Sequence, residues 1–557
     1  PMSPLAFACR SLRRLPALQT RGMHLQYGPN APAWATCDPN GMGKEEPASV
    51  VNLVKGQWAS SEEYIEVVDP LNGDVFMKVS DTKKHELAPF LSSLASCPKS
   101  GLHNPFKNPE RYLLYGDVCA RAAADLRTEK TSDFFARLIQ RVAPKSWSQA
   151  MGEVVVTRKF LENMSGDNVR FLARGFTVPG DHAGQSSMGF RWPYGPVALV
   201  TPFNFPLEIP ALQMLGALFM GNKAVVKADS KVAAVAEQFI RLLHHHGMPA
   251  EDLDLLHGPG ETMHELLLRA RPRQTCFTGS ARVAELLAKD MHGRVALEDA
   301  GFDWKILGPD VPKDARDFEY VAWQCDHDAY AFSGQKCSAQ SILLVHKNWA
   351  EAGIEKLLKQ LAGRRTLRDL TVGPVLTQTT ERMLGHMSDL LQLPGARVAW
   401  GGKALTGHSI PAMYGAIEPT AVFVPLESIL ASEGAFALAT TEIFGPLQVI
   451  TEYNDGDLPR ALETMERMTQ HLTAAVVTND ERVMQHILGS TVNGTTYCGL
   501  RARTSGAPQN HWFGPAGDPR AAGIGSPESI IKVWSCHREV IRDAGPIPKG
   551  WALPPPS

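Results

Sequence analysis

The turn around Cys337 holds the residue types that a covalent catalyst needs. Residues 332–340 read FSGQKCSAQ and precede the apolar, strand-like run Ser341–Val345. A thiol attacks as its thiolate, which is favoured by nearby positive charge, exposed backbone N–H groups and partial access to solvent. Lys336 places a cation beside the cysteine, and Gly334 permits backbone geometry that other residues resist. Because an arbitrary free cysteine is more often a small buried side chain, a nucleophilic Cys337 depends on the rest of the chain.

Composition narrows the class of protein. The chain has 557 residues, of which 44% are hydrophobic and 20% charged, as in a globular protein of several domains. A net charge of -2 argues against sequence-independent binding to nucleic acid, which needs a surplus of Lys and Arg. No apolar run approaches the roughly 18 residues of a membrane span. We therefore expect a small-molecule substrate, with neither nucleic acid nor membrane as partner.

Cysteine and histidine spacing gives no sign of a metal. The nine cysteines are widely scattered without a C-x-x-C pair, so we expect neither a disulfide framework nor a structural metal. The only histidine cluster, His244–His246, follows an amphipathic run and precedes Gly247. This pattern is typical of a helix C-terminus, where imidazolium suits the helix dipole and glycine caps the helix.

The first 37 residues are basic and contain no acid. They include Arg10, Arg13, Arg14 and Arg21, whereas the first acidic residue is Asp38. Such a segment is typical of an organelle transit peptide, and it lacks the apolar region of a secretory signal. We expect residues 1–37 to direct the protein to mitochondria, with a disordered basic tail as the alternative.

Alternating strand and helix patterns predict the fold class. After a hairpin-like region over 51–79, helical spacing recurs over 113–126, 134–142 and 150–171. Strand and helix patterns then alternate, which predicts a doubly wound parallel sheet with ligand sites at the carboxyl ends of its strands. The predicted strands of this series are Val197–Val200, Ala224–Lys227, Asp254–Leu256 and Thr275–Phe277; the helices are Ile209–Met220, Lys231–His245, Glu261–Ala270 and Ala281–Asp290.

A second series of strands predicts a second α/β domain. It runs from Cys337 to about Tyr497 and includes Arg397–Trp400, Ala421–Val424, Leu447–Ile450 and Thr473–Val477. The segment Ser505–Pro527 is too irregular for a core element, and its aromatic residues are unusual in a passive linker. We expect it to be a functional loop.

Five segments resemble the aldehyde dehydrogenase superfamily in order and approximate spacing. They are Thr201–Leu207 (TPFNFPL), Phe277–Ser280 (FTGS), Leu297–Gly301 (LEDAG), Ser333–Cys337 (SGQKC) and Glu442–Pro446 (EIFGP). Within the superfamily the chain is most similar to the plant-type Δ1-pyrroline-5-carboxylate (L-glutamate γ-semialdehyde) dehydrogenases, from about residue 45 to the C-terminus. Three segments carry this similarity: Phe190–Val197 (FRWPYGPV), Glu298–Pro309 (EDAGFDWKILGP) and Gly506–Gly517 (GAPQNHWFGPAG).

The resemblance implies an α/β fold of three parts. Residues 45–173 and 195–303 would form a Rossmann-like NAD-binding domain, and residues 304–504 an α/β catalytic domain. Residues 174–194 and 505–545 would contain a β-flap for oligomerisation and the substrate-anchoring loop. Homo-oligomers, dimers or larger, are therefore expected.

The resemblance also assigns the catalytic residues. Cys337 would attack the aldehyde, the side-chain amide of Asn204 and the backbone N–H of Cys337 would hold the oxyanion, and Glu298 would activate water. Taken alone, Asn204 is better explained as a helix cap, and Glu298 as a solvated charge at a strand end; the catalytic roles depend on both occurring together with Cys337.

For the cofactor, the resemblance implies NAD held by six residues: Thr201, Lys227, Gly279, Ser280, Glu442 and Phe444. Gly279 and Ser280 would present backbone N–H groups and a helix N-terminus to the pyrophosphate. Many NAD-preferring relatives carry Glu three places after the lysine. This chain has Ser230 there, so Asp229 would have to repel the 2'-phosphate of NADP.

For the substrate, the resemblance implies that the α-carboxylate is held by Ser338 and by backbone N–H groups of Gly506 and Ala507. Glu208 could meet the α-ammonium group, although an acid at a helix N-terminus needs no substrate to explain it.

The expected activity is NAD-dependent oxidation of L-glutamate γ-semialdehyde to L-glutamate in proline catabolism, in the mitochondrial matrix. The alternatives are another ω-semialdehyde dehydrogenase, such as one for succinic semialdehyde, and a catalytically silent protein that uses the fold for binding.

Overall fold

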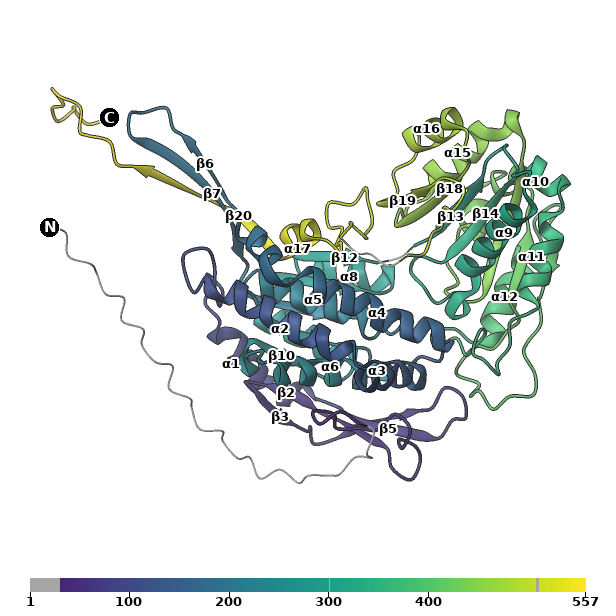
Figure 1. Ribbon diagram of the computed structural model, residues 1–557, viewed down its shortest axis with the longest axis horizontal. Helices are drawn as coiled ribbons and strands as arrows, with labels where there is room; N and C mark the ends of the chain where they lie inside the picture. Colours follow the sequence, from purple (N-terminus) through teal and green to yellow (C-terminus); the bar gives the residue numbers. More distant parts are fainter. Residues whose placement is uncertain (1–30, 300, 507–509) are drawn as a thin grey trace.

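The computed structural model describes residues 31–299, 301–506 and 510–557 (Figure 1). Most of the expected transit peptide, 1–37, therefore lies outside the described residues, and so does Ala507. Two seven-stranded sheets, each covered by helices, form the body of the molecule, and a narrow three-stranded sheet projects from it. The α/β fold class expected from the sequence is found.

The first sheet has five parallel strands and an antiparallel edge. Its order is β12-β11-β8-β9-β10-β2-β3, in which β2 and β3 are antiparallel to their neighbours. The strands are β12 (Val295–Glu298), β11 (Gln274–Thr278), β8 (Pro196–Val200), β9 (Lys223–Lys227), β10 (Leu253–Leu255), β2 (Asn52–Val54) and β3 (Gln57–Ala59).

Successive side chains of β9 enter different cores, because neighbouring residues of a strand point to opposite faces. Ala224 and Val226 belong to the large core cluster, and Val225 belongs to the core on the other face. The large core contains α2 (Glu110–Leu126), α3 (Glu129–Val142), α4 (Trp147–Asn163), α5 (Glu208–Phe219) and α6 (Ala233–His245); the other contains α1 (Ala88–Ser96), α7 (Gly260–Ala270) and α8 (Ala281–Asp290). Burial on both faces explains why these strands are continuous apolar runs.

One predicted helix is shorter than expected. The helical pattern over 150–171 continues past the end of α4, but the helix stops at Asn163 and a 3-10 helix follows over Gly166–Ala173. Gly166 has a φ of 59°, a left-handed conformation that an α-helix does not contain. The apolar spacing therefore persists across a break in the helix.

The second sheet has the order β15-β16-β17-β14-β13-β18-β19, and only β15 is antiparallel to its neighbour. Its strands are β15 (Arg397–Trp400), β16 (Thr420–Phe423), β17 (Leu447–Tyr453), β14 (Gln340–His346), β13 (Asp303–Leu307), β18 (Thr473–Val477) and β19 (Thr495–Cys498). One core contains α9 (Ala315–Tyr330), α10 (Lys347–Glu351) and α11 (Ile354–Ala362); the other contains α12 (Thr380–Leu390), α13 (Leu426–Ile429), α14 (Glu433–Ala439), α15 (Leu458–Arg467) and α16 (Glu481–Gly489).

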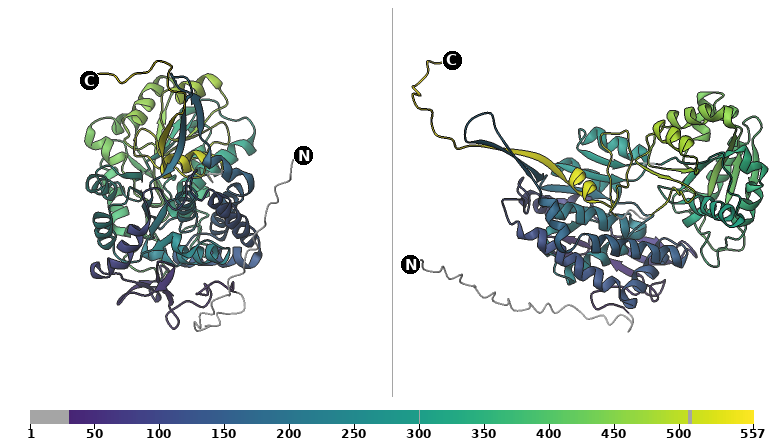
Figure 2. Two further views of the ribbon diagram at one scale, coloured as in Figure 1. Left: turned by 90° about the vertical axis from the view of Figure 1, so that its left-hand side faces the viewer. Right: turned by 45° about the horizontal axis from the view of Figure 1, so that its top comes forward.

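A third sheet forms the projecting flap. It consists of β6 (Phe176–Pro179), β7 (Gln185–Pro193) and β20 (Ser535–Asp543), with β7 in the centre and both pairings antiparallel. Figures 1 and 2 show it extending away from both large sheets. The helix α17 (Pro527–Trp534) precedes β20 and packs on α5. This contact holds the base of the flap against the first large sheet's helices. A small sheet of β1 (Ala48–Val50), β5 (Val75–Ser80) and β4 (Tyr64–Val68) completes the N-terminal part.

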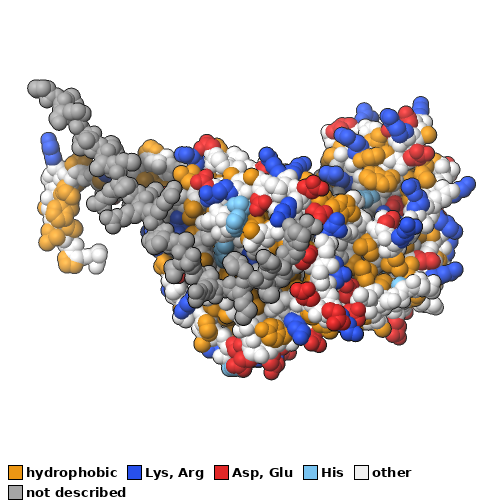
Figure 3. Space-filling model, turned by 60° about the horizontal axis from the view of Figure 1, so that its bottom comes forward, with side chains coloured by type: hydrophobic (Ala, Val, Ile, Leu, Met, Phe, Trp, Pro, Cys, Tyr) orange, Lys and Arg blue, Asp and Glu red, His pale blue; other side chains and the backbone are white. Residues whose placement is uncertain are grey.

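The charges on the surface are mixed. The molecule has two lobes, each built around one of the seven-stranded sheets. On the face shown in Figure 3, acidic and basic side chains are interspersed over both lobes, without a broad area of a single sign. This distribution agrees with the net charge of -2.

Candidate active site

The candidate residues gather where parallel strands end. Glu298 is the last residue of β12, Lys227 is the last residue of β9, and Thr201 and Gly279 directly follow β8 and β11. Cys337 comes from the other sheet, in the turn between α9 and β14. The carboxyl ends of parallel strands are the usual site of ligands in α/β folds.

The turn before Cys337 has an unusual backbone. Phe332, Ser333 and Gly334 have consecutive positive φ angles of 53°, 52° and 70°. A Cβ on Gly334 would lie 2.1 Å from the carbonyl oxygen of Gly445, so only glycine fits there. Non-glycine residues in this conformation are costly and persist only where the surroundings impose it. The packing around residues 332–334 therefore fixes the backbone conformation of the turn that leads to Cys337.

Cys337 lies beside the expected base. Its thiol is half-buried, and the buried carboxylate of Glu298 is close enough for each group to shift the pKa of the other. Burial raises the pKa of Glu298 to about 7, and the neighbouring Cys337 thiol opposes that rise. A carboxylate with a pKa near neutrality can both accept and release a proton at physiological pH.

One expectation about Cys337 is wrong. We expected its surroundings to favour the thiolate, with Lys336 as the nearby cation. Burial, followed by the charge of Glu298, instead raises the pKa of the Cys337 thiol well above its ordinary value. The Lys336 Nζ donates a hydrogen bond of 2.6 Å to Ser505 Oγ, and burial lowers the pKa of Lys336 to about 8. In this arrangement the thiol form is favoured, and Glu298 is the group placed to take its proton.

Asn204 is buried in the turn between β8 and α5. Its Oδ1 accepts a hydrogen bond of 3.2 Å from the N–H of Phe205. The alternative role as a helix cap is not observed, because the N–H groups of Leu207 and Glu208 at the start of α5 donate to Glu153 Oε1 at 2.8 and 3.2 Å.

A buried ion pair supports this turn. The Lys145 Nζ lies 3.0 Å from Glu153 Oε2 and donates a 2.7 Å hydrogen bond to the carbonyl of Asn204. Both side chains are almost fully buried, and the Lys145 ammonium also lies 4.1 Å from the centroid of the Phe332 ring. The pair therefore connects the Asn204 turn, the start of α5 and the turn before Cys337. Neither residue could be predicted from the sequence, because a lone lysine and a helical glutamate have the pattern of surface charges.

A cavity of about 410 Å³ opens beside Cys337. It is lined by Cys337, Ser338 and Gly506 of the expected site, and by further polar residues contributed by both lobes. The further polar lining residues are Lys145, Ser148, Gln149, Glu153, Glu208, His327, Lys336, Arg503 and Ser505. Ser338 and Gly506 are therefore brought to the nucleophile as expected, whereas Ala507 lies outside the described residues.

The expected cofactor residues on the first sheet are connected by backbone hydrogen bonds. The N–H of Thr201 donates to the carbonyl of Lys227 at 3.0 Å, and the N–H of Gly279 donates to the carbonyl of Glu298 at 3.1 Å. Thr201 Oγ1 is buried without a hydrogen-bond partner in the described part of the chain, which leaves a group for a ligand to bond. Ser280 is the N-cap residue of α8, yet its side chain does not cap the helix. These residues fit a dinucleotide whose pyrophosphate lies at the N-terminus of α8.

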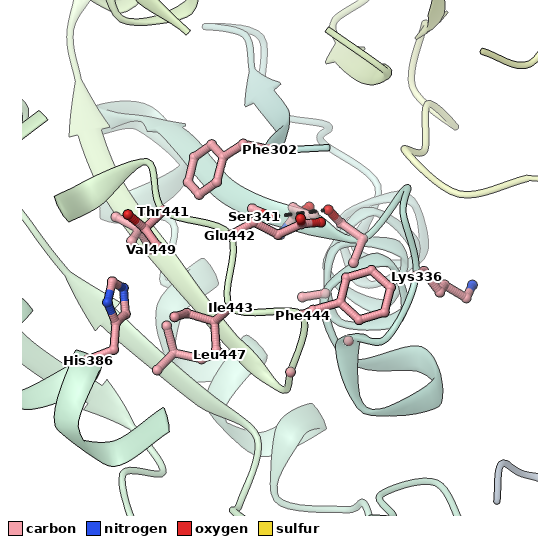
Figure 4. Close-up of a pocket in the computed structure, with 15 residues that line it drawn as sticks. Phe302, Lys336, Ser341, His386, Thr441, Glu442, Ile443, Phe444, Leu447 and Val449 are labelled. Atoms are coloured by element: carbon pink, nitrogen blue, oxygen red, sulfur yellow. Dashed lines mark hydrogen bonds between the residues drawn. The ribbon is translucent and has the colours of Figure 1, made fainter. Parts of the chain in front are cut away.

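Glu442 and Phe444 belong to the loop before β17. Figure 4 shows both at a second, narrower pocket, together with Phe302 and Ser341, while the side chain of Lys336 points away from it. Burial raises the pKa of Glu442 to about 8, and the nearby backbone N–H of Gly301 opposes that rise. The Phe444 ring packs edge-on against Phe203, which precedes Asn204, with the ring centroids 5.9 Å apart.

Asp229 is held in a defined position after Lys227. Its carboxylate accepts hydrogen bonds of 2.9 Å from the backbone N–H and from the Nζ of Lys231. The Lys231 ammonium partly offsets the negative charge that was expected to repel a 2'-phosphate.

Three further observations concern the described residues as a whole. They contain no group of three His, Cys, Asp or Glu side chains able to hold a metal ion, and their eight cysteines are all free. No helix among them has the length and hydropathy to cross a membrane.

The fold and the gathered motifs define the class of protein. The sequence pattern of the aldehyde dehydrogenase family matches residues 58–516, and the chain belongs to this family. It is 62% identical over 522 residues to the mitochondrial delta-1-pyrroline-5-carboxylate dehydrogenase 12A1 of Arabidopsis thaliana, covering 94% of this chain and 93% of that protein. It is also 27% identical over 381 residues to 1-pyrroline-5-carboxylate dehydrogenase 2 of Bacillus subtilis, covering 66% of this chain and 69% of that protein.

Solved structures share the fold. The NAD+ complex of betaine aldehyde dehydrogenase from Staphylococcus aureus superimposes with a TM-score of 0.75, covering 92% of this chain and 98% of that chain. At 18% identity this similarity concerns the fold alone.

Proposed function

We propose that this chain oxidises L-glutamate γ-semialdehyde, the open form of Δ1-pyrroline-5-carboxylate, to L-glutamate with reduction of NAD, as a step of proline catabolism. The observation that carries the chemistry is the placement of the buried Glu298 carboxylate beside the Cys337 thiol, at a cavity lined by both cationic and anionic side chains. The substrate assignment is supported by 62% identity to the Arabidopsis dehydrogenase over nearly the whole of both chains.

Glu298 would take the thiol proton as the Cys337 sulfur attacks the aldehyde carbon, giving a thiohemiacetal. Asn204 would hold the resulting oxyanion through its Nδ2, which donates no hydrogen bond within the described residues, together with the N–H of Cys337. An oxyanion donor typically contributes about 3–4 kcal/mol to the transition state. Loss of hydride to the cofactor would convert the thiohemiacetal into a thioester. After passing the thiol proton to solvent, Glu298 would activate the water that hydrolyses this thioester, releasing glutamate and restoring the thiol.

The cofactor would be held by Thr201, Lys227, Gly279, Ser280, Glu442 and Phe444. When bound, its nicotinamide ring accepts the hydride from the thiohemiacetal. Lys227 is buried and lies at the end of β9, and burial lowers its pKa. The α-carboxylate of the substrate would be held by Ser338, Gly506 and Ala507. We propose NAD rather than NADP because the fixed carboxylate of Asp229 disfavours a 2'-phosphate.

The proposal extends to organisation and location. Residues 45–173 and 195–303 would bind NAD, residues 304–504 would form the catalytic domain, and residues 174–194 and 505–545 would contain the flap and anchor loop. The flap exposes Phe176, Val178 and Ile541, which supports burial against a second copy in a homo-oligomer. The basic segment 1–37 would direct the chain to the mitochondrial matrix.

The direct test is an initial-rate assay of reduced nicotinamide formation with pyrroline-5-carboxylate. The enzyme should prefer this substrate to succinic semialdehyde in kcat/KM, and the opposite order would reject the substrate assignment. Cys337→Ala should abolish the reaction, while unchanged turnover would reject the mechanism and leave the silent binding protein as the better description.

A further inference from the structure

The cavity beside Cys337 has different charges on its two sides. The part of the chain that carries the second sheet contributes the cations Lys336 and Arg503. The part around α4 and α5 contributes Glu208 and the Lys145–Glu153 ion pair, whose two charges offset each other. A zwitterionic amino-acid aldehyde has its carboxylate and ammonium groups on one carbon. It would therefore meet groups of opposite sign on opposite walls.

Glu208 is the acid of this cavity whose carboxylate forms neither a hydrogen bond nor an ion pair within the part of the chain that the structure describes. Glu208 is 9% exposed, and Lys145 and Lys336 act on its carboxylate only through longer-range charge. The other acid, Glu153, is occupied by Lys145 and by the N–H groups of Leu207 and Glu208. Buried carboxylates are costly without a partner, so the position of Glu208 calls for a ligand.

Another acid already performs the structural role expected of Glu208 at the N-terminus of α5. It lies in the first turn of α5, where an acid would stabilise the helix dipole. However, Glu153 Oε1 accepts from the first N–H groups of that helix, so the Glu208 side chain is not needed as its cap.

A second acceptor lies in the same cavity. Gln149 Oε1 is buried and has no hydrogen-bond partner among the described residues. An ammonium group has three N–H donors, and a carboxylate with an amide oxygen offers complementary acceptors.

We propose that Glu208 and Gln149 bind the α-ammonium group of the substrate and thereby select an amino-acid aldehyde over an aldehyde that has only a carboxylate. This inference rests on the proposed function and adds the residues that recognise the amino group. Burial and the charge of Glu153 raise the pKa of Glu208 to about 8, although the charges of Lys145 and Lys336 oppose that rise. An ammonium group beside the Glu208 carboxylate would lower its pKa, because a neighbouring positive charge favours the ionised form.

The test compares two substrates of equal chain length, L-glutamate γ-semialdehyde and glutaric semialdehyde, which lacks the amino group. Glu208→Gln should lower kcat/KM for the amino compound by about 10- to 100-fold, the usual contribution of a hydrogen bond to a charged group. The ratio of the two kcat/KM values should shift toward glutaric semialdehyde by a similar factor. Gln149→Leu should shift the ratio in the same direction, and Glu208→Asp, which keeps the charge, should retain part of the preference.

Binding of products gives a readout independent of turnover. L-Glutamate should inhibit the Glu208→Gln variant less strongly than the wild type, whereas inhibition by glutarate should not weaken. Glu129→Gln is the matched control, because Glu129 is an exposed acid in the first turn of α3, and it should leave both substrates unaffected. Melting temperatures would identify any variant that fails to fold.

An equal loss with both substrates would show that Glu208 is only structural, and no loss with either would show that it does not bind the ammonium group. Both results would overturn the inference. Failure of the wild type to oxidise pyrroline-5-carboxylate would instead reject the proposed function itself.

Discussion

Gly334 lies against Gly445 so closely that a Cβ on Gly334 would be 2.1 Å from the Gly445 carbonyl oxygen. This contact joins two loops of the site, because Gly334 precedes Cys337 by three residues and Gly445 follows Glu442 by three. The position of the nucleophile is thereby coupled to the loop that contains Glu442 and Phe444, two of the residues expected to hold the cofactor.

Gly334→Ala should disrupt both loops. The added methyl group meets backbone, which cannot rotate away, and the positive φ penalises any side chain. We expect a loss of at least about 1–3 kcal/mol in the free energy of unfolding. Denaturant titration would measure it. Gly353→Ala is the control, since Gly353 also has a positive φ but nothing within 4 Å of its Cβ position. Equal effects at both sites would show that the contact with Gly445 is unimportant.

Glu298 should determine the pH dependence of turnover. Its pKa is raised to about 7, and it acts as a base only when ionised. The rate should therefore rise as pH increases through about 7 and level off above. Glu298→Gln should remove this rise and reduce kcat by about 10²- to 10⁴-fold. A kcat profile measured with saturating substrate would test both expectations, and persistence of the rise in the variant would assign it to another group.

The Lys145–Glu153 pair should matter for stability as well as for rate. Lys145→Met would leave Glu153 as an unpaired buried charge, which costs about 3–5 kcal/mol, and would release the carbonyl of Asn204. We expect a lower melting temperature and a reduced kcat. The double variant Lys145→Met with Glu153→Gln should recover part of the stability without recovering kcat. Full recovery of both would contradict a positioning role for Lys145.

Asp229 should influence the choice between NAD and NADP. Asp229→Asn keeps an oxygen that can accept from the N–H of Lys231 but removes the negative charge near the expected 2'-phosphate. Relative to NAD, kcat/KM with NADP should increase roughly fivefold, corresponding to about 1 kcal/mol for an exposed charge pair. An unchanged ratio would mean that other residues exclude the phosphate.

The flap should carry an oligomer contact. Ile541 on β20 is 65% exposed, and Ile541→Asp would place a charge where we expect apolar burial. Sedimentation should show a smaller particle than the wild type. Leu268→Asp, at an exposed apolar residue of α7, should leave the size unchanged. If the Ile541 variant keeps the wild-type size, this strand does not form the main contact.

The sequence by itself predicted the alternation of strands and helices, the two α/β units and the family. Periodicity identifies such elements because burial on both sides of a sheet demands apolar runs, as in β8 and β9. It failed where a local break leaves the pattern intact, as at Gly166 after α4. The five motifs also placed Cys337, Glu298 and Asn204 together, since their order and spacing are those of the family.

The tertiary structure alone decided how charges act within the site. Lys336, adjacent to Cys337 in the sequence, donates a hydrogen bond to Ser505, whereas Glu298, from another sheet, lies beside the thiol and raises its pKa. Glu153 takes the helix N-terminus that the sequence assigned to Glu208, which leaves the Glu208 carboxylate facing the cavity. Distances between groups far apart in the chain determine these pairings, and burial determines their pKa values. Neither quantity is present in the sequence.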